Sequence, residues 1–320
     1  MDSRQRVMKV LCHEIPDRVP LFEVLIDGRI AERVIGVCKD SWTLSPGETV
    51  KLGRALGQDS LCVALRSWKD PRMKGSKPDI DDLKPPSMAE VEASVDRCDE
   101  VARCAHDEGI CVSAYVHGAF DVVYESLGFE NFMFLLYDDF GYVDALTEKF
   151  YLYHKTIAEM AVNTDIDYLL VGDDISFKTG LFINPGMFLK LWYEREKNLV
   201  QVSKKAGKPV EFHTDGRLDA VIPYLMDIGV DLVNPAEPYS NDILELKKTY
   251  GDKIALRGNL DMGLLSRGTR EEVHSAAKAL ILGMKPGGNY VCSSSHSVSL
   301  DVKLDNYMEV VRAVDEYGRY

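Results

Sequence analysis

Eight short apolar runs recur along this chain, and most of them end in polar or acidic residues. Longer stretches with helical periodicity follow several of the runs, an alternation typical of strand–helix units around a parallel sheet. Eight such units predict an α/β fold, the (β/α)₈ TIM barrel, which takes roughly 250 residues or more. The runs span residues 19–23, 60–64, 110–115, 167–174, 209–213, 232–235, 254–259 and 289–293.

The length of 320 residues fits a single barrel domain over residues 1–320, because barrels of this kind tolerate insertions. Residues 1–9 are charged and helix-like, and we expect a helical extension at this end. The stretch 66–86 is rich in lysine, aspartate and proline and has no apolar periodicity. We expect a long loop there, either a functional lid or a solvated excursion.

Local signals also place several helices between the runs. Asn184-Pro185 is typical of a helix start and Ala206-Gly207 of its end, so we expect one helix over 184–206. Thr269 and Glu272 form a capping-box pattern ahead of another helix. The stretch 125–162 contains two helical patterns separated at 138–139.

The charge distribution and the cysteines exclude several classes of protein. The formal net charge is −13 and the basic residues are scattered, so we expect no nucleic-acid partner. The seven cysteines include no C-x-x-C pair, which argues against a disulfide framework or a zinc ribbon and favours the cytoplasm. No stretch reaches the ~18 apolar residues of a membrane span, and we expect a soluble protein without a targeting segment. Phosphate-binding and serine-hydrolase motifs are absent.

Chemically reactive side chains follow nearly every run, where a barrel places its active site. Because the carboxyl ends of barrel strands meet at one face, we expect these side chains to surround a common basin. In chain order they are Glu23, Tyr115, His117, Asp173, Asp174, His213, Asp215, Glu237, Asn259, Asp261 and His296.

The strongest local motif is His213-Thr214-Asp215-Gly216, because one strand end can present both the imidazole and the carboxylate to a ligand. Such groups suit zinc, which in catalytic sites has three protein ligands and an open position. His213, Glu237 and His296 are one candidate set, and Asp215 competes with Glu237 as the third ligand. Two alternatives stay open: a metal-free site that binds a polar substrate, and a His213 that only holds its loop.

Three acidic residues have both a functional and a structural interpretation. Asp173 and Asp174 would repel each other unless one is paired or points elsewhere, so we expect one of them to be structural. Asp174 is also placed to anchor the loop that follows it. Asn259 is expected to contact substrate, whereas Asp261 either does so or caps the turn after it.

Taken together, these motifs resemble the uroporphyrinogen decarboxylase superfamily over nearly the whole chain. The residues that carry the likeness are Glu14-Ile15-Pro16-Asp17-Arg18-Val19-Pro20, Gly172-Asp173-Asp174, Lys208-Pro209-Val210, His213-Thr214-Asp215-Gly216, Gly258-Asn259-Leu260-Asp261, Pro286-Gly287-Gly288, His296 and Asp305-Asn306. The resemblance implies a barrel enzyme of one of two kinds: a porphyrinogen decarboxylase, or a zinc-dependent methyltransferase that serves a corrinoid on a partner protein. It also implies a homodimer.

The chain looks more like the methyltransferases. Decarboxylases of the superfamily carry W-x-M-R-Q-A-G-R, whose arginines hold the substrate's propionates, and here only Arg29 is available in that region. The zinc site of the coenzyme M methyltransferases looks like H-x-C with a distant cysteine, and the matching positions are His213, Asp215 and His296. Both thiolates are thus replaced by harder ligands, which suit a zinc that polarises oxygen.

The resemblance therefore implies transfer of a methyl group from a methoxylated, for example aromatic, donor to cob(I)alamin. Tyr115, His117 or Asp173 would supply the proton for the leaving group, and Glu23, Asp174, Asn259 and Asp261 would contact the substrate. The chain has no cobalamin-binding D-x-H-x-x-G, so the corrinoid is expected on a partner protein, docked on the barrel helices and the loop 66–86. Two alternatives remain: a metal-free decarboxylase or lyase, and an inactive barrel that only binds a corrinoid protein.

Overall fold

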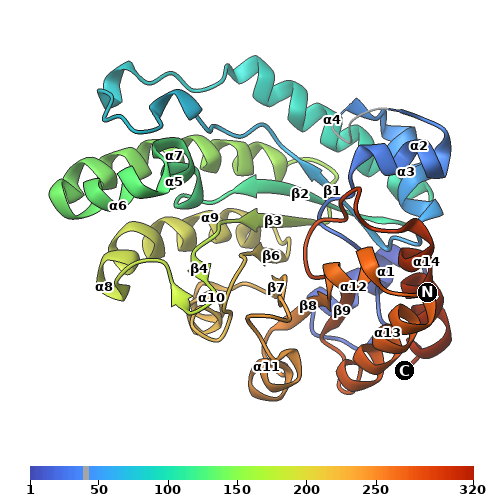
Figure 1. Ribbon diagram of the computed structural model, residues 1–320. Helices are drawn as coiled ribbons and strands as arrows, with labels where there is room; N and C mark the ends of the chain where they lie inside the picture. Colours follow the sequence, from blue (N-terminus) through green and yellow to red (C-terminus); the bar gives the residue numbers. More distant parts are fainter. Residues whose placement is uncertain (39–42) are drawn as a thin grey trace.

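The computed structural model describes residues 1–38 and 43–320, and its centre is a curled sheet of seven parallel strands (Figure 1). The sheet confirms seven of the eight predicted strands, with bounds that differ by at most two residues. In spatial order the strands are β1 (Ser60–Ala64), β2 (Cys111–His117), β3 (Tyr168–Gly172), β6 (Val210–His213), β7 (Leu232–Asn234), β8 (Ala255–Leu260) and β9 (Tyr290–Ser294).

The predicted first strand, residues 19–23, is an extended segment that bridges the two edges of this sheet. Leu21 forms a parallel bridge with Cys292 of β9, and its carbonyl accepts a hydrogen bond from the backbone N–H of Asp59, next to β1, at 2.7 Å. Pro20 has no N–H to donate, but its carbonyl accepts one from Cys292 at 2.9 Å. The segment therefore occupies the eighth strand position of the barrel, although it does not form a continuous hydrogen-bond ladder. The predicted fold class is confirmed.

Helices surround this sheet (Figure 1), and α1 covers the end at which the strands begin. Val7, Val10 and Leu11 of α1 (Ser3–Leu11) pack with Phe22 and with residues at the starts of the strands. The other principal helices are α2 (Gly28–Ile35), α3 (Pro46–Ala55), α4 (Met88–Asp107), α5 (Asp121–Leu127), α6 (Phe129–Asp138), α7 (Phe140–Ala161), α8 (Pro185–Phe188), α9 (Glu194–Lys205), α10 (Ile222–Ile228), α11 (Ile243–Tyr250), α12 (Met262–Arg267), α13 (Arg270–Met284) and α14 (Leu304–Tyr317).

The helix signals in the sequence are confirmed. Asn184 caps α8, Thr269 and Glu272 form a complete capping box at α13, and Asp139 caps α7 where the doubled helix was expected to divide. One detail differs, because a π-helical turn at Leu189–Tyr193 connects α8 to α9.

The segment 66–86 is a long loop, as predicted, with two single 3₁₀ turns at Pro71–Met73 and Ile80–Asp82. The hydroxyl of Tyr142 in α7 donates to the carbonyl of Pro78 at 2.9 Å, so the loop is fastened to the helix beneath it. A short hairpin of β4 (Ser176–Phe177) and β5 (Gly180–Leu181) follows β3 and was not predicted. No helix in the described part of the chain is long and apolar enough to cross a membrane.

Candidate active site

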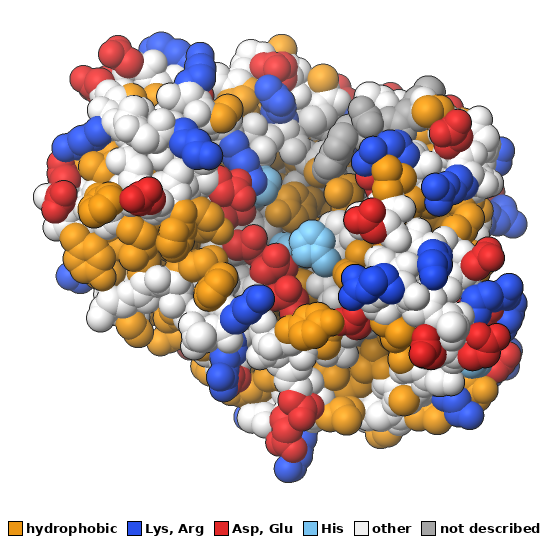
Figure 2. Space-filling view, viewed as in Figure 1, with side chains coloured by type: hydrophobic (Ala, Val, Ile, Leu, Met, Phe, Trp, Pro, Cys, Tyr) orange, Lys and Arg blue, Asp and Glu red, His pale blue; other side chains and the backbone are white. Residues whose placement is uncertain are grey.

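A hollow of about 1540 Å³, open to solvent, lies at the carboxyl ends of the strands. Figure 2 shows histidine and acidic side chains gathered where the surface is hollowed. Six of the eleven side chains selected from the sequence line it: Tyr115, His117, Asp174, His213, Asp215 and His296. The predicted common basin therefore collects about half of its expected members.

Three of these side chains form a group that fits a metal ion. One ligand atom from each of Asp174, His213 and Asp215 lies within 4.8 Å of the others. His296 adjoins the group, because its Nε2 lies 3.8 Å from Asp215 Oδ2, although its side chain is about half exposed (55%). The group thus contains Asp174, which the sequence predicts as a substrate contact, and does not contain Glu237.

The turn after β6 depends on Gly216. Its φ of +88° is a left-handed conformation, and a Cβ there would lie 2.6 Å from the carbonyl oxygen of Ser176. A glycine is therefore required for the chain to turn directly behind Asp215. Glu237 holds the same turn, because its Oε2 accepts a hydrogen bond from the N–H of Gly216 at 2.7 Å.

A chain of buried polar groups orients His213. Its Nδ1 lies 2.7 Å from Oδ1 of Asn234, whose Nδ2 donates to Glu211 Oε1 at 2.7 Å. Glu211 in turn pairs with Arg257, with Nε and Oε1 2.7 Å apart. Because the amide nitrogen faces Glu211, the amide oxygen faces His213, and Nδ1 must carry the proton. The Nε2 lone pair is then free toward Asp215, the tautomer that a metal ligand needs.

Asp215 is electrostatically strained in the absence of a cation. Burial and the neighbouring carboxylate of Asp174 raise its pKa, whereas His213 opposes the rise. Its Oδ1 is buried, and no hydrogen-bond donor among residues 1–38 and 43–320 reaches it. A buried carboxylate oxygen without a donor is costly. A bound cation would remove both problems, so the residues fit a metal site.

Tyr115 and His117 form a second group on the wall of the hollow. The Tyr115 ring lies against Gly172, where a Cβ would come within 2.0 Å of the phenol oxygen. Burial and nearby carboxylates hold the pKa of Tyr115 well above its usual value. His117 Nδ1 lies 3.2 Å from Asp121 Oδ2. Burial alone would raise the pKa of Asp121, but His117 and Lys69 bring it below the usual value, so Asp121 remains a carboxylate that holds the imidazole.

Asp173, the other member of the acidic pair, is buried against the loop after β2, and its role as proton donor stays a prediction. Its buried carboxylate accepts hydrogen bonds from the backbone of Phe120 and Asp121 and from the indole of Trp192, at 2.6 to 3.2 Å. Burial raises its pKa well above the usual value. These contacts hold the loop after β2, and Asp173 does not line the hollow.

Asn259 and Asp261 also lie outside the lining of this hollow. Asn259 lines a separate depression beside residues 238–244. Asp261 caps α12 by accepting from the N–H of Leu264 at 2.6 Å, which is its alternative structural role. Their predicted contact with substrate stays a prediction.

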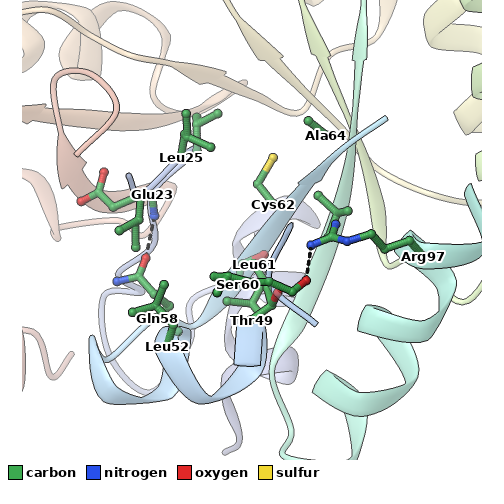
Figure 3. A pocket seen from close by; sticks show the side chains of 15 residues that line it. Glu23, Leu25, Thr49, Leu52, Gln58, Ser60, Leu61, Cys62, Ala64 and Arg97 are labelled. Carbon is green, nitrogen blue, oxygen red and sulfur yellow. Dashed lines mark hydrogen bonds between the residues drawn. The ribbon is translucent and has the colours of Figure 1, made fainter. Parts of the chain in front are cut away.

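Glu23 lines a smaller, neighbouring cavity (Figure 3). Its carboxyl group contacts the Ser294 hydroxyl at 2.6 Å and the Tyr307 hydroxyl at 3.2 Å. Burial raises the pKa of Glu23 to about 7, although Ser294 and Arg257 oppose the rise. The Ser294 hydroxyl also donates to the carbonyl of His296. The Ser294 hydroxyl has a single proton, and both the Glu23 carboxyl group and the His296 carbonyl lie within its reach.

Sequence reasoning missed Asn234, Glu211 and Arg257, which orient His213. A signal was available, because Glu211 and Arg257 are charged residues within apolar runs. Charges inside a buried strand must be paired, and β6 and β8 both flank β7, the strand of Asn234.

A family model described as uroporphyrinogen decarboxylase (URO-D) matches residues 63–317. The chain belongs to the uroporphyrinogen decarboxylase family. The resemblance noted in its motifs is thereby confirmed. Uroporphyrinogen decarboxylase of Pseudoalteromonas translucida is 30% identical over 77 residues, 24% of this chain and 22% of that protein. The Coxiella burnetii protein of the same name is 26% identical over 129 residues, 39% of this chain and 32% of that protein.

These matches span about a fifth to a third of the length of the curated relatives. A solved methyltransferase from Methanosarcina mazei is similar over 99% of both chains, with a TM-score of 0.79 at 16% sequence identity. Because the sequence identity is low, this likeness establishes only the fold of the present chain, which is barrel-like along the matched length.

Proposed function

We propose that this chain is a methyltransferase that moves a methyl group from a methoxylated small molecule to the cobalt of a corrinoid carried by a partner protein. The observation that carries the proposal is the group of Asp174, His213 and Asp215, in which a buried carboxylate oxygen has no donor among the described residues. The whole-length likeness to a methyltransferase supports the same assignment.

Zinc would be held by Asp174, His213 and Asp215. His296, next to Asp215, is the fourth candidate ligand. Glu237 would support the site by holding the turn at Gly216. Zinc bound by oxygen and nitrogen ligands would act as a Lewis acid toward an ether oxygen. The Asn234 amide keeps the His213 Nε2 lone pair directed at this group, so the protein contributes a ligand that is already oriented.

The reaction breaks the carbon–oxygen bond of the donor and forms a carbon–cobalt bond with the electron pair of cob(I)alamin. The leaving oxygen takes up one proton and departs as an alcohol or a phenol. Tyr115 and His117 line the same hollow and are the proton donors that we propose, with His117 positioned by Asp121. The hollow is open to solvent, which allows a large partner to present its cobalt.

The names of the curated relatives favour a second candidate, decarboxylation of a carboxylated substrate without a metal. One experiment separates the two. The purified chain is mixed with zinc, cob(I)alamin and a panel of methoxyarenes, and the methyl–cobalt product is followed by its absorbance while released carbon dioxide is measured.

We expect methyl transfer that depends on zinc and is lost in Asp215→Asn. Asp219→Asn is the matched control, because Asp219 lies on the same loop and is paired with Arg217 outside the group. Carbon dioxide release without zinc dependence would contradict the methyltransferase and support the decarboxylase. Transfer that survives Asp215→Asn at full rate would contradict the role of the metal group.

A further inference from the structure

Among the residues that the structure describes, no carboxylate pairs with Arg97, which lines the same hollow. It extends from α4 toward the cavities, where its Nη2 donates to the backbone carbonyl of Leu44 at 3.0 Å (Figure 3). No ion pair joins it to an acidic residue in the described part of the chain. The other basic side chains of the hollow differ, because Arg66 pairs with Glu90 and Lys69 pairs with Glu125.

The surroundings make this unpaired charge costly. Arg97 is half-buried and lines both the large hollow and the smaller cavity beside it. Burial lowers the pKa of Arg97, which means that the guanidinium has lost water without gaining a compensating carboxylate. Several of its N–H donors remain available in the fixed, planar arrangement that matches a carboxylate.

The wall next to Arg97 is apolar. Leu25, Cys62 and Ala64 line both cavities, and burial raises the pKa of the Cys62 thiol to about 12, so this wall is uncharged at neutral pH. In the sheet, β1 carries Cys62 and Ala64 of this wall, and β2 and β3 separate β1 from β6, which carries His213. A ligand that reaches both sides therefore needs an apolar body.

We propose that Arg97 binds the carboxylate of the methyl donor, so that the substrate class is an amphipathic methoxylated carboxylate. Its anionic end would lie at Arg97, its apolar body against Leu25, Cys62 and Ala64, and its ether oxygen near Asp174 and Asp215. The acidic group would repel the carboxylate, and this repulsion fixes the direction in which the molecule enters. The inference deepens the proposed function and rests on it for the role of the ether oxygen.

The test compares matched anionic and neutral ligands by calorimetry, with the full chain and without any corrinoid. The pairs are para-methoxybenzoate with para-methoxybenzamide, and methoxyacetate with methoxyacetamide. In the unaltered chain we expect the carboxylate of at least one pair to bind about tenfold more tightly than its amide, as a charge-assisted pair provides. Arg97→Met should abolish that preference.

Two further variants keep the result interpretable. Arg97→Lys retains the charge but not the planar fork and should lose several-fold in carboxylate affinity. Arg103→Met removes an arginine from the same helix that is exposed and paired with Asp99, and should change nothing. Thermal unfolding of each variant checks that it is folded.

Equal affinity of acid and amide in both pairs would overturn the inference, as would a preference that survives Arg97→Met. These outcomes are separate from those of the proposed function. An Arg97-dependent preference without methyl transfer would support the anion site and contradict the methyltransferase. Methyl transfer from neutral and anionic donors at equal rates would support the methyltransferase and contradict the anion site.

Discussion

The two sides of the hollow carry opposite charges that lack compensation among the described residues. On the side of β3 and β6, Asp174 and Asp215 lie close enough to repel each other, and a buried oxygen of Asp215 has no donor among the described residues. On the side of α4, Arg97 is half-buried, and no carboxylate in residues 1–38 and 43–320 pairs with it. A folded chain normally pairs buried charges. From this contrast we infer a cation site on one side and an anion site on the other, with an apolar wall between them.

Removing a ligand from the acidic side should have the largest effect. His213→Ala deletes the one imidazole of the three-residue group, so we expect loss of bound zinc and a fall in methyl transfer of at least about a thousandfold. Zinc content by atomic emission and the initial rate of cobalt methylation measure it. His274→Ala is the control, because His274 pairs with Glu309 and Glu316. Full activity without His213 would refute the metal site.

The apolar wall between the two sides also gives a prediction, because burial raises the pKa of Glu23 beside it. The folded pKa of Glu23 is about 7, above its ordinary value of 4.5. The folded state therefore holds this proton at pH values where the unfolded chain has released it, and stability falls as pH rises through that window. The total loss is roughly 3 kcal/mol.

Glu23→Gln mimics the protonated acid, since its amide can donate to Ser294 while its oxygen accepts from Tyr307. The variant should match the unaltered chain at about pH 4.5 and exceed its free energy of unfolding by up to roughly 3 kcal/mol at about pH 8. Denaturant titration at both pH values measures the difference. The same difference in free energy of unfolding at both pH values would show that Glu23 does not titrate as described.

An intermediate effect is expected from Asn234, which acts through His213. Asn234→Ala removes the acceptor of the Nδ1 proton, so the imidazole loses its fixed tautomer. Such outer partners of metal ligands typically contribute about 10 to 100-fold in affinity. Competition with a chelator measures zinc affinity, and unfolding curves separate this loss from general destabilisation. Unchanged affinity in a folded variant would mean that the Asn234–Glu211–Arg257 chain is purely structural.

The two sides of the hollow also differ in how well the sequence predicts them. His213 and Asp215 follow one apolar run, and Asp174 follows the run that precedes it, so a parallel barrel brings all three together. Which of Asp173 and Asp174 faces the hollow depended on the pleat of one strand end, where neighbouring side chains point to opposite faces. The run at 19–23 was predicted as a strand, but Pro20 has no N–H to donate, and Leu21 forms only an isolated bridge with Cys292.

The cationic side could not be predicted in the same way. Arg97 lies in the middle of a helix, where arginines are ordinarily solvated. Arg29, the arginine that the sequence motif offered for a carboxylate clamp, lies on α2, with 2.9 Å between its Nη2 and Oδ2 of Asp27. Only the arrangement of α4 beside β1 brings Arg97 into the hollow, and that depends on long-range packing.

The smallest expected effect distinguishes an unpaired cation from a paired one within the same hollow. Arg66 also lines it, but its guanidinium is about half exposed (49%) and lies 3.3 Å from Glu90. Solvent and the neighbouring carboxylate already compensate this charge, so Arg66→Met should weaken binding of para-methoxybenzoate by less than about twofold. Calorimetry beside Arg97→Met measures both under the same conditions. Equal losses in the two variants would mean that the hollow attracts anions through its summed positive charge, whereas a loss confined to Arg97 requires a direct contact between the guanidinium and the carboxylate.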